Sequence, residues 1–481
     1  MRFPSFLSFA GLLALSSVAA AQSVTLLPGA VPRGLSRDGQ AVTGWFNNSP
    51  FLWTPGAGFV ALTGSVYDPK AVADLGSHVV GMMDDPVTGK QSSGYWTAAT
   101  GQWLSLGPYQ GNIGCPGYGE ALTVSSDGSV IGGELFIGCN LNGYVWDQAT
   151  GYSVMPKTGG FASVECVSGD GVLAGGWDTH PTQGYRRAAL WSAAHVEAFP
   201  LVSAANPNGA GEINVFNSDG SIYGGLDDGG GGTFIFRDGV IVHLDVPQNL
   251  SRPTGLSDDG SVVVGSYGNF GVGYGAWVWN ECDGGSLAKD FFQSQGVVFP
   301  PGLVLERMFG VSRDGRTFLA QYKGAGTGAA YIELPADWQA TTYCTAKTNS
   351  QGCVPSICAA GYASLSLQAP YPVVLHDALN NKFGLLFYGL NGPASFPFGG
   401  GTMCVASPIR RTSVQSSGGN PPPDDCTGSY AFDFNAYAQS GADAGLVAGV
   451  SVFAQYWSRD PAHLDGTGQG LSDAVTFQLH P

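Results

Sequence analysis

Acidic side chains stand in adjacent pairs in stretches of this chain that read as loops. Asp84 and Asp85 form one pair, and Asp227 and Asp228 form another. Two carboxyl groups that face each other across a cleft are the machinery of glycoside hydrolysis, in which one acts as an acid and the other as a base or nucleophile. Because the distance between two loops cannot be read from sequence, solvated loop acids are the default interpretation and sugar hydrolysis is the alternative.

Basic side chains give fewer candidates for binding chemistry. Recognition of a substrate carboxylate needs a cluster of arginines, whereas Arg37, Arg313 and Arg316 fall in tight turns that we place on the opposite face from the long loops. Arg186 and Arg187 remain as isolated candidates. The seven histidines are scattered without the spacing of metal ligands. We therefore expect no metal and no cofactor.

A recurring Ser-x-Asp-Gly phrase is the third group of candidates. It resembles the Asp-box turn of sialidase-type propellers, but that motif needs an aromatic residue where Gly44 and Gly265 stand here. We interpret the phrase as a turn in which serine bonds the backbone and glycine adopts a positive φ. Asp-Gly between alternating apolar runs predicts a hairpin with a two-residue type I′ turn. The six turns contain Asp38 and Gly39, Asp127 and Gly128, Asp170 and Gly171, Asp219 and Gly220, Asp259 and Gly260, and Asp314 and Gly315. In a seventh, degenerate copy, Leu75 replaces the aspartate before Gly76.

The turns return at intervals of 37 to 55 residues, and an aromatic strand follows each hairpin. Such a period in an all-β sequence predicts propeller blades of four strands each. Seven units predict a seven-bladed β-propeller over residues 22–335. The recurring tryptophans of the third strand are expected to pack between blades rather than to form a sugar platform. They are Trp53, Trp96, Trp146, Trp191 and Trp279.

The last unit lacks a fourth strand, and an unmatched strand lies at Val24–Gly29. We predict that this N-terminal strand completes the seventh blade and closes the ring, which removes an exposed sheet edge. The short turns then share one face and the long, varied connections share the other, where we expect any binding site. A short helix is expected near 287–292, before the last unit.

Composition indicates an exported, acidic protein. Residues 1–21 read as an export signal, with Arg2, an apolar run and the site Ala19-Ala20-Ala21, and the sequence predicts no membrane span after it. The formal net charge is −16, and 28 of the 36 acidic residues precede residue 341. This charge argues against nucleic acid and anionic polysaccharide as partners and permits proteins and neutral glycans. We expect a location outside the cell or at its surface.

The phrase Gly-x-Ser-x-Asp-Gly-x-Val-x-Gly, followed by a strand such as Phe51-Leu52-Trp53, resembles the HAF-type probable extracellular repeat family of bacterial secreted proteins. The resemblance covers about residues 30–335 and is weakest in the second unit. It implies export and a repeat architecture, and it implies no particular ligand or reaction.

After a linker at 336–343, residues 344–481 form a different module. Alternation such as Tyr430, Phe432 and Phe434 is typical of a half-buried strand, and about eight short strands predict a β-sandwich. The opening Tyr343-Cys344-Thr345-Ala346-Lys347 is similar to C-terminal modules of predicted secreted proteins of marine and planctomycete-type bacteria. The terminal position favours attachment or sorting at the cell surface.

Nine cysteines in an exported chain indicate disulfides and at least one remaining thiol. Loop positions on one face pair Cys115 with Cys139. Within the C-terminal module we expect Cys344 to pair with Cys353 and Cys404 to pair with Cys426. Cys166 lies at a buried strand position and is expected to be free. A bridge from Cys282 to Cys358, joining the two modules, is left open.

These observations favour a secreted, non-catalytic protein that binds an extracellular ligand, either a protein or a neutral glycan, through the loop-rich propeller face. The first alternative is a propeller carbohydrate-active enzyme, a hydrolase or a lyase. A structural or matrix protein is the third interpretation. The oligomeric state stays open.

Overall fold

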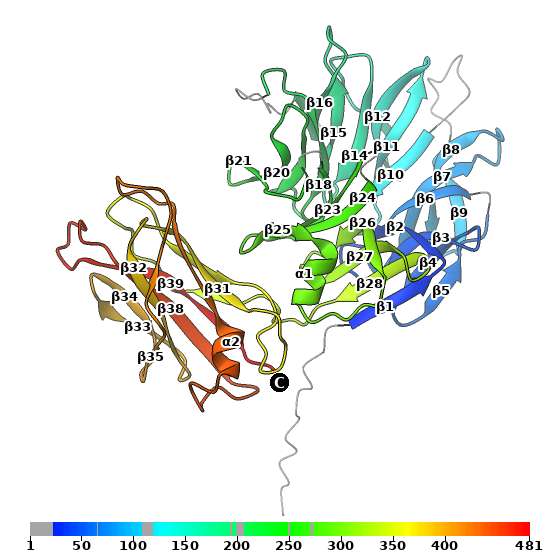
Figure 1. Cartoon of the computed structure of the whole chain (residues 1–481). Helices are drawn as coiled ribbons and strands as arrows, with labels where there is room; N and C mark the ends of the chain where they lie inside the picture. The colour runs from blue at the N-terminus through cyan, green and yellow to red at the C-terminus, as the bar shows by residue number, and fades with distance from the viewer. Residues whose placement is uncertain are drawn as a thin grey trace, which may run out of the picture.

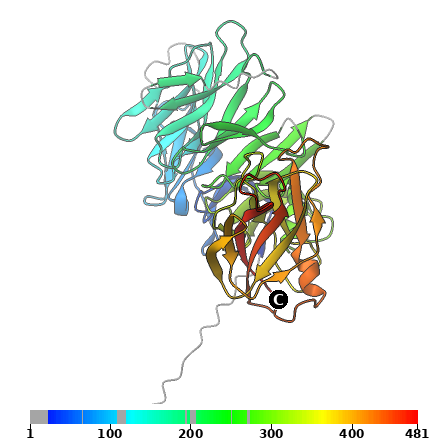
Figure 2. The ribbon, with the colours of Figure 1, turned by 90° about the vertical axis from the view of Figure 1, so that its left-hand side faces the viewer.

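The computed structural model describes residues 23–481 apart from 65, 108–118, 193–194, 199–205, 249–250 and 270–272. The expected export signal therefore lies outside the described residues. Figure 1 shows a larger body, coloured blue to green, and a smaller one, coloured yellow to red, and Figure 2 shows the same pair from the side. Among the described residues, no helix is long and apolar enough to cross a membrane.

The larger body has a β-propeller fold, and its described residues form seven four-stranded antiparallel sheets. Six of these sheets take four consecutive strands each. The first three are β2 (Ala30–Leu35), β3 (Val42–Phe46), β4 (Ser49–Thr54) and β5 (Gly58–Ala61); β6 (Val66–Val72), β7 (His78–Asp84), β8 (Gln91–Thr97) and β9 (Gln102–Ser105); and β10 (Gly119–Val124), β11 (Val130–Ile137), β12 (Asn140–Asp147) and β13 (Gly151–Val154). The next three are β14 (Ala162–Val167), β15 (Leu173–Thr179), β16 (Arg186–Ser192) and β17 (His195–Ala198); β18 (Gly211–Phe216), β19 (Tyr223–Asp227), β20 (Gly232–Arg237) and β21 (Val240–His243); and β22 (Ser251–Leu256), β23 (Val262–Asn269), β24 (Gly273–Asn280) and β25 (Gly284–Leu287).

The seventh sheet is completed by the first strand of the chain. Its own strands are β26 (Val304–Val311), β27 (Thr317–Lys323) and β28 (Gly328–Glu333), and β1 (Ser23–Pro28) pairs antiparallel with β28, with Leu26 opposite Ala330. Each sheet contacts the next, and the first sheet contacts the last. The predicted pairing of the N-terminal strand with the last unit is therefore present.

The Ser-x-Asp-Gly turns differ from the predicted type I′ geometry. Only the glycine has a positive φ, which is 74° at Gly39, and Asp38 does not. The Gly39 amide donates to the Ser36 carbonyl, the Ser36 hydroxyl donates to Asp38, and the Ala41 amide donates to the Ser36 hydroxyl. This is a type I turn with glycine at its last position, inside a four-residue loop. The prediction of type I′ was wrong because the serine and aspartate side chains bond the turn and leave positive φ to the glycine alone.

These turns also join the sheets to one another. In each turn a backbone amide donates to the turn of the next sheet, and the acceptor is a backbone carbonyl or, at Asp74 and Asp258, a side-chain oxygen. The links are Asp38 N to Asp74 Oδ1, Asp74 N to Ser126 O, Ser126 N to Gly169 O, Asp170 N to Ser218 O, Ser218 N to Asp258 Oδ1, Asp258 N to Arg313 O, and Arg313 N to Arg37 O, at 2.6 to 3.0 Å. They form a closed circuit of seven steps, so the turn face holds the ring together.

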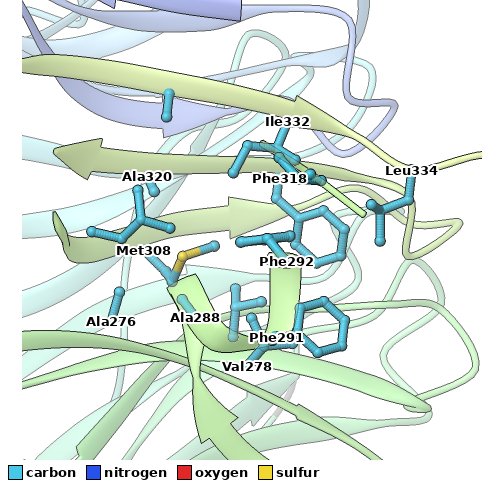
Figure 3. Close-up of a cluster of buried hydrophobic side chains, with 14 of the residues drawn as sticks. Ala276, Val278, Ala288, Phe291, Phe292, Met308, Phe318, Ala320, Ile332 and Leu334 are labelled. Carbon is cyan, nitrogen blue, oxygen red and sulfur yellow. The ribbon is translucent and has the colours of Figure 1, made fainter. Parts of the chain in front are cut away.

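Helix α1 (Ala288–Ser294) fills the connection before the last sheet, as the sequence predicted, and it has a packing role. Phe291 and Phe292 are buried against Phe318 of β27, and Phe291 also meets Trp338 edge-on at 5.7 Å between ring centroids. Figure 3 shows both helix phenylalanines directed into the cluster beside Phe318. Trp338 lies within the predicted linker 336–343, so this cluster anchors the linker at that residue.

The smaller body contains two facing antiparallel sheets and a hairpin. One sheet holds β29 (Thr341–Tyr343), β39 (Gln469–Gln478), β38 (Ser451–Arg459), β32 (Phe383–Gly389), β35 (Arg410–Arg411) and β36 (Gln415–Ser416). The other holds β30 (Ser356–Ala359), β31 (Pro372–Ala378) and β37 (Gly428–Asp433), and the hairpin is β33 (Pro393–Phe398) with β34 (Gly401–Val405). Tyr456 of the first sheet stacks on Tyr430 of the second and donates to the Val373 carbonyl at 2.8 Å. The predicted alternation ends early, because Phe434 begins helix α2 (Phe434–Gln439).

The disulfides of the smaller body join residues far apart in sequence. Cys344 pairs with Cys404 and Cys353 pairs with Cys426, so both predicted pairings were wrong. The Asn349 side chain accepts the amides of Gln351 and Cys353, which holds Cys353 in a local turn. Cys344 instead follows β29, where the Tyr343 hydroxyl donates to the Cys404 carbonyl.

The two bodies are joined by a covalent bridge. Cys282, in a turn of the sixth sheet, pairs with Cys358 of β30, which is the possibility that the sequence left open. His376 of β31 contacts the Cys282 carbonyl at 3.1 Å through Nε2. Cys166 is buried and free, Cys139 is in a disulfide, and Cys115 lies outside the described residues.

Candidate binding site at the propeller axis

The innermost strand of every propeller sheet carries a β-bulge at the same place. In β2 the pairing with β3 shifts between Pro32 and Gly34, so Arg33 is an extra residue with no partner opposite it. Bulges turn a side chain away from the regular alternation of a strand and are frequent beside functional sites. The seven bulge residues are Arg33, Lys70, Leu122, Glu165, Asn214, Thr254 and Phe309. All seven line one cavity of about 210 Å³.

The recurring glycine of the second strand leaves the space that the bulge needs. A Cβ atom built on Gly176 would lie 2.0 Å from the Ser163 carbonyl oxygen, and one on Gly225 would lie 1.9 Å from that of Glu212. Glycine within a strand commonly marks such a close backbone approach. Six sheets have glycine at this position, and the seventh has Ala320. In that sheet the pairing of β26 with β27 also shifts a second time, between Leu305 and Arg307.

Arg37 narrows the cavity at the turn face. It belongs to the first sheet, yet its guanidinium donates to the Val167 carbonyl of the fourth sheet at 3.3 Å. Burial lowers the pKa of this guanidinium, and Asp258 and Asp74 oppose the effect. The Arg37 side chain therefore crosses the cavity at the turn face, and the wider part of the cavity lies toward the long loops.

The first three sheets carry a network of ion pairs at the loop end. Lys70 contacts Asp68 at 2.9 Å and Glu120 at 2.6 Å, while Arg33 contacts Asp68 at 3.0 Å. Burial alone would raise the pKa of Asp68, but hydrogen bonds from Trp45, Lys70 and Arg33 outweigh it and lower the pKa. Within this network each positive side chain is paired with a negative one, so we interpret this side of the cavity as a rigid wall.

The third to fifth sheets place buried carboxyl groups beside this wall. Glu134 of β11 accepts the Ser163 hydroxyl at 3.0 Å, and burial raises its pKa, with Glu165 and Glu120 adding to the rise. Glu212 of β18 contacts both Arg252 and Arg186, yet burial still raises its pKa. Carboxyl groups with a raised pKa near a cavity are candidates for holding or donating a proton.

The fifth to seventh sheets open into a cavity of about 650 Å³ at the loop face. Arg307 stacks on Tyr274 at 4.1 Å, and it has no ion-pair partner among the described residues. The side-chain oxygen of Asn214 is buried here and finds no hydrogen-bond partner in the described part of the chain. Arg252, Arg33, Glu165 and Asp228 complete the charged lining. The site can therefore offer guanidinium donors and oxygen acceptors to one ligand.

Of the paired acids singled out in the sequence, Asp228 alone lines this cavity, and burial raises its pKa. Asp85 instead holds its own loop by accepting from Ser105 and Thr88. Asp227 is buried and accepts from Asn206 and the Gly229 amide. These bonds make Asp85 and Asp227 supports of their own loops.

The two arginine candidates have different environments. Arg186 lies over Trp177 at 4.1 Å and contacts Glu212 at 3.5 Å, which places it at the rim of the axial site. Arg187 contacts Asp178 at 3.7 Å and donates to Thr158, so it is held in a separate cluster. Among the residues that the structure describes, no group of three or more His, Cys, Asp or Glu side chains is arranged to hold a metal ion.

Comparison with known proteins shows similarity of fold alone. No protein-family model matches the chain, and no curated protein sequence matches it. Among solved structures, oligogalacturonate lyase from Vibrio parahaemolyticus is 11% identical, with 66% of this chain and 97% of the lyase aligned at a TM-score of 0.44. The β-propeller domain of Cps50 (Swd1) from Myceliophteria thermophila is 14% identical over 65% and 98% of the chains, with a TM-score of 0.40. The β-propeller domain of the Trilobed protease from Pyrococcus furiosus is 8% identical, with 63% of this chain and 95% of that domain aligned at a TM-score of 0.39.

Proposed function

We propose that this chain is a secreted, non-catalytic binding protein that holds an extracellular ligand in the axial cavity on the loop-rich face. In this proposal the seven sheets are the blades of one propeller of the extracellular-repeat type, and the facing sheets of residues 344–481 are a β-sandwich module. Three disulfides within the described residues fit an oxidising location outside the cell.

The observation that carries the proposal is the ring of bulge residues. A purely structural ring would be expected to repeat one side chain, as five of the seven turns repeat the serine and all seven repeat the glycine. The bulge position instead holds two cations, one anion, two neutral polar residues and two apolar residues. An uneven ring that lines a cavity and leaves the Asn214 oxygen unpartnered suits one oriented ligand rather than packing.

Filling the cavity tests this proposal. Thr254 is a bulge residue that lines both the channel and the wide cavity and is exposed there, so Thr254→Trp should block the site without disturbing the core. Gln102→Trp places the same side chain on an exposed position of β9 and is the matched control. The mature chain, its two variants and an array of glycans and peptides would be used. We expect the parent chain and Gln102→Trp to bind the ligand and Thr254→Trp to lose binding. Equal binding by the two variants would refute the axial site.

A second candidate function is hydrolysis or lysis of a carbohydrate, which the raised pKa of Glu134 specifically favours. A carboxyl whose pKa is raised is a better general acid than a free one, and Glu134 also accepts a hydrogen bond from Ser163 at 3.0 Å. Turnover of the array glycans by the mature chain tests this. If the chain is an enzyme, product should form, and Glu134→Gln should abolish it. The control Glu281→Gln changes an exposed glutamate that pairs with Arg237 and should leave product formation intact. Binding without product formation supports the first proposal.

A further inference from the structure

We propose, building on the binding function above, that the wide axial cavity recognises a saccharide unit that bears a carboxylate, which is a uronic acid residue. The cavity of about 650 Å³ falls within the roughly 300–1,000 Å³ of small-ligand sites. It is lined from the fifth, sixth and seventh sheets, with Arg33 of the first sheet and Glu165 of the fourth at its edge.

Every cation that lines this cavity is an arginine. The Nε of Arg33 donates to Asp68 at 3.0 Å, and Nε is also the nitrogen of Arg252 that lies nearest to Glu212. Arg307 presents one face to Tyr274, so its N–H edges are not used by that contact. The planar fork of a guanidinium matches the two oxygens of a carboxylate and binds them in bidentate fashion.

The two acids in the lining favour a singly charged carboxylate over a phosphate monoester, which carries more charge at neutral pH. Glu165 accepts the Trp177 indole N–H at 2.9 Å, and it stands near the same space as Asp228. A multiply charged anion would be repelled by both carboxylates, whereas a carboxylate with neighbouring hydroxyl groups can donate hydrogen bonds to them.

The unpartnered oxygen of Asn214 is a third acceptor that needs a donor, because a buried polar atom without one lowers stability. Hydroxyl groups on consecutive ring carbons supply several donors close to one carboxylate. A peptide C-terminus has fewer donors near its carboxylate, because its backbone offers only about one N–H group per residue. Phe309 and Tyr274 add ring surface for the C–H face of a sugar. The lining therefore fits a uronic residue better than a peptide end.

The net charge of the chain argues against long acidic polysaccharides, but it does not decide whether the cavity binds a short acidic oligosaccharide. A charge of −16 describes the whole sequence and governs long-range repulsion, while binding depends on the groups that line the cavity. Three arginines and two acids line it, and because Arg307 has no ion-pair partner among the described residues, one guanidinium stays available for a ligand. Long-range repulsion should slow association with long acidic polymers more than with short oligosaccharides.

Titration calorimetry of the mature, disulfide-intact chain tests the ligand class. The probes are galacturonate and glucuronate oligosaccharides of two to four residues, the same oligosaccharides with their carboxyls reduced to alcohols, and a tripeptide with a free C-terminus. We expect an acidic oligosaccharide to bind, its reduced form to bind at least about tenfold more weakly, and the tripeptide not to compete. Arg307→Met should weaken binding about 10- to 100-fold, the usual scale for a charge-assisted hydrogen bond. Arg459→Met removes a charge from an exposed position of β38 and should leave binding unchanged.

Several outcomes would overturn the inference. Equal binding of the acidic and reduced oligosaccharides would show that the carboxylate is not recognised, and tighter binding of the tripeptide would assign the site to peptides. In both cases loss of binding in Thr254→Trp would leave the proposed binding function standing. Arg307→Met with unchanged affinity and an unchanged circular dichroism spectrum would also refute the role of this arginine. Binding that Thr254→Trp does not affect would overturn the axial site itself.

Discussion

The glycine that faces each bulge can be tested by adding one methyl group. In Gly176→Ala the new Cβ would lie 2.0 Å from the Ser163 carbonyl oxygen and 3.0 Å from the Glu165 amide nitrogen. Both atoms belong to the backbone and cannot rotate away, so β14 and β15 must separate by about 1 Å or lose the bulge, a form of overpacking.

The magnitude follows from the contacts that must change. Overpacking in a well-packed region costs about 1–3 kcal/mol. The loss of one or two ladder hydrogen bonds adds about 1 kcal/mol each. We therefore expect Gly176→Ala to lower the free energy of unfolding by about 2–5 kcal/mol, the sum of these two costs. Because Glu165 is the bulge residue itself, ligand affinity at the axial cavity should fall as well.

The assay is urea unfolding of the mature protein followed by circular dichroism, with Gly160→Ala as the matched control. Gly160 lies in the same unit and is exposed, and a methyl group added there would meet no atom within 4 Å. That control should stay within about 0.5 kcal/mol of the parent, as surface substitutions usually do. If Gly176→Ala were as stable as Gly160→Ala, then the glycine would not be needed for the bulge.

Three further predictions concern the cysteines and one buried acid. Replacing both Cys282 and Cys358 with serine should lower the free energy of unfolding by about 2–5 kcal/mol in urea melts, because it opens a loop that links the two bodies. Burial raises the pKa of Asp473 to about 6, so the folded state binds a proton that the unfolded state releases, and stability should fall as pH rises from about 4 to 6. Asp473→Asn should remove that slope in melts at pH 4 to 7 while keeping an oxygen for the Ile357 amide. Burial also raises the pKa of the Cys166 thiol, so iodoacetamide should label it in urea and leave it unmodified in the native protein, as mass spectrometry would show.

The architecture of the larger body was predictable because its signals are local. An Asp-Gly turn and an aromatic strand identify a hairpin within about ten residues, and the repeat of that phrase gives the number of units. The pairing of β1 with β28 followed from a missing strand in the last unit. The degenerate second copy also folds as a turn, since Leu75 takes a positive φ of 56° before Gly76.

The bulge ring and the disulfides could not be predicted in the same way, because both depend on register. A one-residue insertion in a strand leaves the apolar pattern nearly intact, so Arg33 reads as an ordinary outward residue until its partners are known. The one usable signal for a bulge is the glycine of the second strand, such as Gly44. In the sequence alone, this glycine shows only that the aromatic residue of an Asp-box is missing at that position. Cys344 and Cys353 are close in sequence, but their strands and turns carry them to Cys404 and Cys426.

The repeat separates what must stay constant from what is free to vary. The turn glycine recurs in all seven turns, the turn serine in five of them and the strand glycine in six sheets. Each performs the same backbone task where it stands, as the bonds of Ser36 and the close approach of Gly176 show. The bulge residue has no backbone task beyond its position, so its side chain can differ from sheet to sheet. A ring of identical blades would present a seven-fold symmetric channel, which suits an ion or a symmetric ligand. Different side chains on a constant frame give the channel distinct sides, and that asymmetry is what an elongated ligand with an acidic group and hydroxyl groups requires.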